Sequence, residues 1–113
     1  MRWTWLVAFL AAFVLADAAC AQPEETAAQL QKRGQALLTK NCGRCHAIGT
    51  SGLSRRPDAP PFRAVMRRYS PEALEEALGE GLSTGHEAMP EFVFQPDEIA
   101  AIVGYLDTLH NSR

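Results

Sequence analysis

Two cysteines and a histidine form the most chemically specific pattern in this chain of 113 residues. The segment "CGRCH" places Cys42 and Cys45 three positions apart, with His46 directly after the second thiol. On a helical turn, side chains with this spacing lie on one side. C-x-x-C-H is the spacing of covalent haem attachment, in which both thiols become thioethers and the imidazole reaches the iron. The sequence therefore predicts one haem c bound through Cys42, Cys45 and His46.

Other uses of two cysteines fit the sequence less well. A thioredoxin-like C-x-x-C motif needs a βαβ context, and no alternating strand pattern is visible. A structural zinc site needs four ligands, usually from a second Cys/His pair of similar spacing, and His86 and His110 do not form one. Chance occurrence of a short motif is the remaining alternative.

A haem iron held from one side has a second axial position, and the sequence offers several side chains for it. The candidates are Met66, His86, Met89 and His110. We expect Met66 to lie in the core, because it follows an apolar residue in a helical pattern. We expect His110, almost at the C-terminus, to face solvent.

Of the other two candidates, Met89 is favoured by its neighbour. Pro90 biases the preceding residue towards extended backbone, which suits an unbranched thioether laid across a haem face. His86 follows Gly85 and precedes an acid, as in a surface turn. We expect Met89 to be the ligand, with His86 and an open site as the alternatives.

The first 21 residues have the pattern of a secretory signal peptide. A basic start precedes an apolar run over residues 3–16, too short for the roughly 20 apolar residues of a membrane span. Cleavage after Ala21 would leave residues 22–113 as one domain with Cys42 and Cys45 as its cysteines. Lipid attachment at Cys20 is disfavoured, because Asp17 occupies the position where a lipoprotein signal has a Leu-like residue.

The rest of the sequence predicts an all-α domain with long loops and no internal repeat. Helical patterns cover about 24–40, 62–69, 70–81 and the segment from 96 onward. We expect Tyr69 to be buried with the second helix, and Gly79 and Gly81 to end the third. Residues 47–61, rich in Gly, Ser and Pro, are expected to be irregular. So small a domain has a thin core, which a large apolar cofactor would reinforce.

Charge is unevenly distributed, although the net charge is −2 both with and without the signal peptide. Five arginines lie between residues 55 and 68, opposed there by Asp58: Arg55, Arg56, Arg63, Arg67 and Arg68. Residues 72–107 contain acids but no Lys or Arg. The two interpretations are a pair of solvated faces and a dipolar surface that orients the protein before docking.

Taken together, these motifs resemble the class I monohaem cytochromes c in their short bacterial form. The resemblance covers nearly all of residues 22–113 and rests on "LL" before "CGRCH", then "PPF", "MP" and "IVGYL". It implies a helical fold around one haem, with crossing first and last helices. Gly34 and Leu38 would meet Ile102 and Tyr105 at that crossing.

The resemblance also implies roles for two loop residues. In this family a proline carbonyl after the loop accepts a hydrogen bond from the proximal histidine, and Pro60, rather than Pro61, is our choice for His46. The family carries its second ligand as a methionine in an "MP" context, which matches Met89.

We therefore expect an exported, periplasmic electron carrier with a His/Met-ligated haem, not an enzyme. Its partners would be redox proteins met in small, transient contacts, and we expect a monomer that binds neither nucleic acid nor, after cleavage, the membrane. The alternatives are a peroxidase or gas sensor with a labile sixth ligand, and a dedicated subunit of a larger oxidoreductase.

Overall fold

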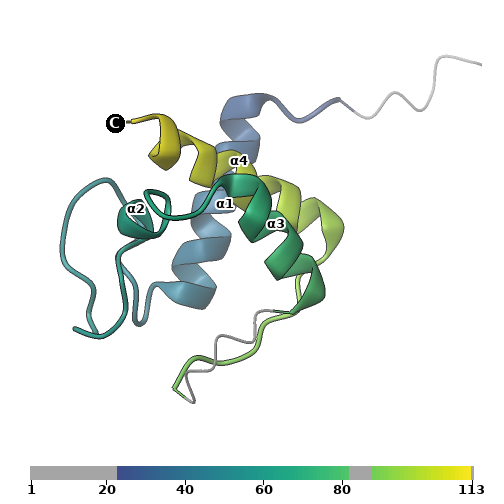
Figure 1. Ribbon diagram of the computed structural model, residues 1–113. Coiled ribbons are helices and arrows are strands. Elements are labelled where there is room, and N and C mark those ends of the chain that lie inside the picture. Colours follow the sequence, from purple (N-terminus) through teal and green to yellow (C-terminus); the bar gives the residue numbers. More distant parts are fainter. Residues whose placement is uncertain (1–22, 82–87, 113) are drawn as a thin grey trace, which may run out of the picture.

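The computed structural model describes residues 23–81 and 88–112, which form four helices and no strand (Figure 1). The helices are α1 (Ala27–Cys42), α2 (Phe62–Val65), α3 (Pro71–Glu80) and α4 (Pro96–Asn111). The predicted all-α fold is thus confirmed. None of the described helices has the length and apolar character of a membrane span. The signal peptide predicted over residues 1–21 and the candidate ligand His86 lie outside the described residues.

Helix α1 begins three residues later than the predicted start at residue 24 and ends two residues beyond the predicted end at residue 40. Thr26 caps the helix: its hydroxyl accepts the backbone N–H of Gln29 at 3.3 Å. In return, the Gln29 side chain accepts the backbone N–H of Thr26 at 2.8 Å. This reciprocal capping box fixes the start of the helix. The other end reaches Cys42, so α1 runs directly into the haem-attachment motif.

Helices α1 and α4 cross in Figure 1, and a glycine makes their close approach feasible. A Cβ atom at Gly34 would overlap the backbone carbonyl of Ala101 on α4 and lie 3.0 Å from the nitrogen of Ile102. Both α4 residues are fully buried, and Leu38 is 2% exposed. The backbones therefore pack directly against one another, with Leu38 one turn further along α1. This arrangement agrees with the predicted crossing.

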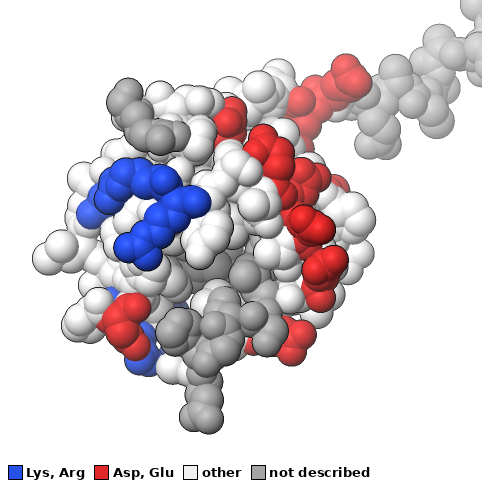
Figure 2. Space-filling view, viewed as in Figure 1, with Lys and Arg blue, Asp and Glu red and all other residues white. Residues whose placement is uncertain are grey.

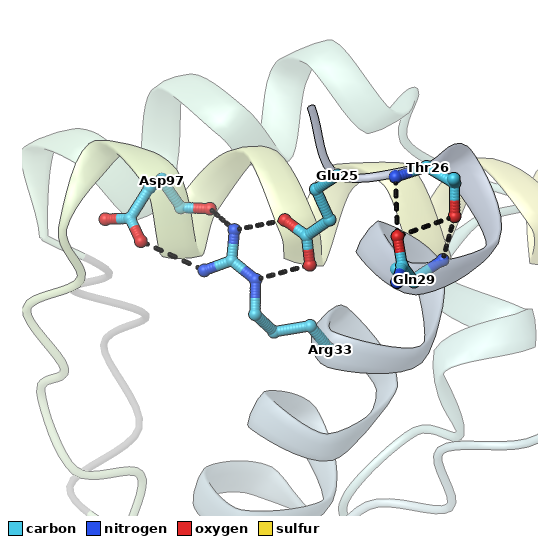
Figure 3. Close-up of polar contacts among 5 residues, drawn as sticks. All are labelled: Glu25, Thr26, Gln29, Arg33 and Asp97. Atoms are coloured by element: carbon cyan, nitrogen blue, oxygen red, sulfur yellow. Dashed lines mark hydrogen bonds and ion pairs between the residues drawn. The ribbon is translucent and has the colours of Figure 1, made fainter. Parts of the chain in front are cut away.

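An ion-pair network ties the start of α1 to the start of α4 (Figure 3). The Arg33 guanidinium donates to both carboxylate oxygens of Glu25, at 3.2 and 3.0 Å. It also donates to the carboxylate of Asp97 at 2.9 Å and to that residue's carbonyl oxygen at 3.2 Å. Because these groups are exposed, the network adds little stability. It does place the segment before α1 beside the start of α4.

Helix α3 follows the predicted pattern except at its end. The Ser70 hydroxyl accepts the backbone N–H of Ala73 at 3.3 Å, and Pro71 occupies the first turn. Gly81, with φ of 90°, ends the helix. Gly79 remains inside the helix, so the expectation that both glycines terminate it was wrong. Only Gly81 adopts the left-handed backbone that favours glycine at a helix end.

The core is centred on α4 and includes Met66, as predicted. The least exposed large side chains are Leu38, Met66, Ile102 and Leu106. The expectation that Tyr69 is buried was wrong, because α2 ends at Val65 and the Tyr69 side chain is 57% exposed. A four-residue helix cannot keep residues 62 and 69 on the same buried face.

The C-terminal histidine is also placed differently from the expectation. His110 is partly buried, and its Nδ1 lies 2.9 Å from the carbonyl oxygen of Met66. Because a carbonyl oxygen only accepts hydrogen bonds, the imidazole donates from Nδ1 in this contact. His110 therefore joins the end of α4 to the segment after α2.

Gly34→Ala should lower the free energy of unfolding by about 2–3 kcal/mol, because the added methyl overlaps backbone that cannot rotate away. The matched variant is Gly79→Ala on α3, where the new Cβ would meet only a side-chain carbon of Ile99 at 4.0 Å. That change should stabilise by roughly 0.5–1 kcal/mol through helix propensity. Urea denaturation of the purified proteins measures the change in the free energy of unfolding for both variants. Equal changes would contradict the close approach of α1 to α4 at Gly34.

Candidate haem-binding site

A cavity of about 760 Å³ opens beside α1, α3 and α4 and has a mainly apolar wall. Its lining includes every residue predicted for the site: Cys42, Cys45, His46, Pro60 and Met89. Much of the remaining wall is aliphatic or aromatic, including Leu38, Phe62, Leu74, Leu78, Phe92, Phe94, Ile102 and Leu106. A shallower groove of about 380 Å³ along α1 and α4 contains none of the predicted site residues. The chemistry-bearing residues thus gather at the larger cavity.

The cysteines and histidine of the motif lie on one turn that continues from α1. The N–H groups of Cys45 and His46 both donate to the carbonyl of Cys42, at 3.1 and 2.9 Å. Neither cysteine forms a disulfide. The turn therefore presents two sulfurs and an imidazole to the same cavity, as the spacing predicted.

The environment of Cys42 differs from that of a catalytic dithiol. Burial, together with a smaller effect of the neighbouring Cys45, raises the pKa of the Cys42 thiol to about 11. Reactive cysteines of redox enzymes instead have lowered pKa values. The raised pKa keeps the free Cys42 sulfur protonated at neutral pH, which argues against the thioredoxin-like interpretation.

The His46 ring is oriented by the loop that follows it. Its Nδ1 lies 2.7 Å from the carbonyl oxygen of Pro60, so the ring donates from Nδ1, and Nε2 is the ring nitrogen left available to bind a metal. Phe62 packs at a tilt of 56° with ring centroids 5.4 Å apart. The carbonyl of Pro61 instead accepts the N–H groups of Ala64 and Val65 in α2. Of the two prolines considered, Pro60 therefore contacts the imidazole.

Three of the four candidates for the second axial position lie among the described residues, and of these three only Met89 lines the cavity. The Met66 side chain is buried in the core, 1% exposed. His110 contacts the carbonyl of Met66. The structure thus brings His46 and Met89 to one cavity from segments more than 40 residues apart in the sequence.

Several contacts that hold the loop over residues 47–61 were not predicted from the sequence. The Ser54 hydroxyl accepts the N–H of Ala47 at 3.0 Å, and Arg63 donates to the carbonyl of Gly52 at 2.7 Å. The Tyr105 hydroxyl donates to the carbonyl of Ile48 at 3.1 Å. These contacts bring the loop back to the motif and so place Pro60. Loop carbonyls leave no pattern in a sequence, so no signal could have identified these pairs.

The donors fit a haem better than a structural zinc ion. Two thiols and an imidazole on one wall, with a thioether in the same apolar cavity, match haem attachment and axial ligation. Within residues 23–81 and 88–112, no three His, Cys, Asp or Glu side chains gather as metal ligands. The zinc alternative therefore lacks its ligand set in the described part of the chain.

Comparison with known proteins gives the same interpretation. Residues 29–106 match the model of the family described as cytochrome c oxidase, cbb3-type, subunit III. The chain belongs to the monohaem class I cytochromes c. A cytochrome c-553-like protein of Synechocystis sp. is 31% identical over 77 residues, which cover 68% of this chain and 67% of that relative. No solved structure matches the chain.

Membership of this family indicates which cofactor the cavity binds. Membership implies a covalently bound haem c, and Cys42 and Cys45 supply the thiols of the C-x-x-C-H motif. This cytochrome is therefore a haem-based electron carrier, with an all-helical fold around its cofactor site.

Tyr105→Phe should lower the free energy of unfolding by about 1 kcal/mol, because the Ile48 carbonyl loses its donor. Burial raises the pKa of Tyr105, so the hydroxyl remains a donor at neutral pH. The control is Tyr69→Phe at the exposed tyrosine, where a change below about 0.5 kcal/mol is expected. Denaturation of the haem-loaded proteins measures the free energy of unfolding of both variants. Equal changes in the two variants would contradict a stabilising role for this hydrogen bond.

Proposed function

We propose that this cytochrome is exported to the periplasm and transfers single electrons through a haem whose axial ligands are His46 and Met89. The observation that carries the proposal is that both side chains line one apolar cavity, with the imidazole held at Nδ1 by Pro60. When bound, the haem supplies a one-electron ferric/ferrous couple. The chain supplies its attachment, its ligands and its apolar surroundings.

Each ligand has a distinct physical effect. A hydrogen bond from Nδ1 to a carbonyl fixes the orientation of a ligating imidazole and raises its basicity. A thioether favours ferrous iron and raises the reduction potential. With both axial positions filled, oxygen and peroxide would not readily bind the iron. A carrier, rather than a peroxidase or gas sensor, is therefore the function that this pair of side chains supports.

A second role is favoured by the family description, which names subunit III of a cbb3-type cytochrome c oxidase. A domain of this kind could serve as a dedicated subunit of a larger oxidoreductase. A tagged chain, expressed at its natural level, distinguishes the two roles. Recovery as a monomer supports a diffusing carrier that meets its partners transiently, whereas stable co-purification with a larger oxidoreductase supports the subunit.

Export is tested directly by the mass of the purified protein. Cleavage after Ala21 would give a haem-bearing chain that begins at Gln22 and is recovered from the periplasmic fraction. An intact N-terminus, or a lipid on Cys20, would contradict this part of the proposal.

His46→Ala should prevent accumulation of stable haem-loaded protein, because binding of the cofactor to the folded state is linked to stability. His110→Ala is the matched control, since that imidazole lies outside the cavity and should change stability but not haem loading. Haem absorbance per unit of purified protein measures both. Normal haem loading in the His46 variant would rule out its assignment as the proximal ligand.

Met89→Ala should lower the reduction potential by at least about 100 mV, a fraction of the ~0.8 V range spanned by axial ligands. It should also let carbon monoxide bind the ferrous protein, which the natural chain should resist. Met66→Leu, a change of similar size in the core, should leave both properties unchanged. Spectroelectrochemistry and carbon monoxide difference spectra measure the effects.

Two results would count against this ligand. Ready carbon monoxide binding by the natural protein would support the enzyme or sensor alternative. An unchanged potential in Met89→Ala would exclude the methionine and leave His86 or an open site.

A further inference from the structure

The segment that leads into α4 carries Met89 to the cavity, and we call residues 88–95 the strap. The strap has no helical structure, and Met89, Phe92 and Phe94 are its partly buried side chains. All three line the cavity. Val93, between the two rings, is instead 82% exposed. The strap therefore turns two aromatic rings and the thioether inward and leaves its remaining side chains near solvent.

The two phenylalanines of the strap form a stacked pair. Their ring centroids lie 6.0 Å apart with an interplanar angle of 26°, a distance at which aromatic rings attract one another. Phe94 also packs against the buried core. Directly after it, the backbone N–H of Gln95 donates to the Glu98 carboxylate at 2.9 Å, as part of the cap of α4. One end of the strap is thus anchored to α4, and Phe92, stacked on Phe94, extends that anchor along the chain towards Met89.

The backbone of the strap gives it little additional support. No backbone hydrogen bond joins residues 90–94 to any other residue that the structure describes. A Cβ atom at Gly81 would lie 3.1 Å from a carboxylate oxygen of Glu91, so this side chain lies against the end of α3. The C-terminal end of a helix carries partial negative charge and does not favour a carboxylate. This contact therefore places the strap beside α3 without fastening it there.

Ion pairs do not fasten the strap either. Figure 2 shows basic side chains on the side of the molecule where α2 lies, and acidic side chains along α3 and the start of α4. Residues 72–107 contain no Lys or Arg. Within the described part of the chain, the ion pairs are those of Arg33 and Arg56, and none includes Glu91. The strap therefore depends on its apolar side chains.

We propose that Phe92 and Phe94 are positioning residues for Met89, and that their stacking holds the thioether at the iron while the protein is oxidised. This inference rests on the proposed His/Met ligation. A thioether favours ferrous over ferric iron, so the bond to the sulfur is weaker in the oxidised protein. The oxidised state is therefore the one in which the packing of the strap decides whether the sixth position stays closed.

Imidazole binding to the ferric, haem-loaded protein measures how readily Met89 leaves. Imidazole takes the sixth position only when the methionine is displaced, so its apparent affinity is proportional to the fraction of molecules in the open form. Phe92→Leu keeps an apolar side chain but removes the stacked ring. We expect this variant to bind imidazole about three- to tenfold more tightly than the natural protein. Phe94→Leu acts on the same stack from the other side and should shift the affinity in the same direction, so either variant is sufficient.

Two controls separate positioning of the methionine from general stability. Val93→Ala changes the exposed residue between the two rings. Leu109→Ala removes a core side chain that is 3% exposed and is not among the described residues that line the cavity. It should lower the free energy of unfolding and leave the imidazole affinity unchanged. Both controls should stay within about twofold of the natural affinity, as expected for sites that act independently.

Tighter imidazole binding in the strap variants, with both controls near the natural value, supports the proposal. An unchanged affinity in the strap variants, or an equal gain in Leu109→Ala, overturns it. Failure of the proposed ligation would be recognised separately, in the natural protein alone. Absence of the weak long-wavelength absorption of a sulfur–iron bond in its ferric form would contradict the His/Met assignment, whatever the variants show.

Discussion

The direct contact of α1 with α4 at Gly34 is the constraint on which the rest of the structure depends. Where a side chain is missing, the α1 backbone lies against the carbonyl of Ala101, and this fixes both helices. Helix α1 then delivers Cys42 at its end, and α4 supplies Ile102 to the cavity wall. The cofactor cavity is therefore built between two elements whose relative position tolerates little adjustment, because packed backbone cannot yield as side chains do.

The orientation of the His46 imidazole depends in turn on the packing of α1 against α4, through the loop that follows the motif. The loop after the motif has no regular secondary structure, so its backbone groups must find partners individually. Tyr105 on α4 holds the carbonyl of Ile48, and Arg63 holds that of Gly52. A loop fixed at these points brings the Pro60 carbonyl to His46. Helix α4 thus contributes, through Tyr105 and the loop, to the orientation of the His46 imidazole.

Features with local causes could be predicted from the residues themselves, whereas long-range features were either implied by the family resemblance, as the helix crossing was, or missed. Ser70 and Pro71 predicted the start of α3 because caps act within a few residues. The C-x-x-C-H spacing located the site because its three side chains share one turn. Tyr69 and His110 were misplaced, since their exposure depends on where α2 stops and on a contact 44 residues away. The ligand role of Met89 stays a prediction, although the fold brings it to the cavity of His46.

The wall of the cofactor cavity in this cytochrome is mainly apolar, and charged side chains lie at its opening. The cavity wall is mainly apolar, which disfavours the ferric state of a bound haem because its extra charge is poorly solvated there. Arg56, paired with Asp58, adds no net charge at the opening, whereas Arg68 lines the cavity and is exposed. The apolar wall can therefore set the electronic environment of a bound haem independently of the charge at the opening. A substitution at the exposed Arg68 would then change the charge at the opening without repacking α1 against α4, as expected for a surface position.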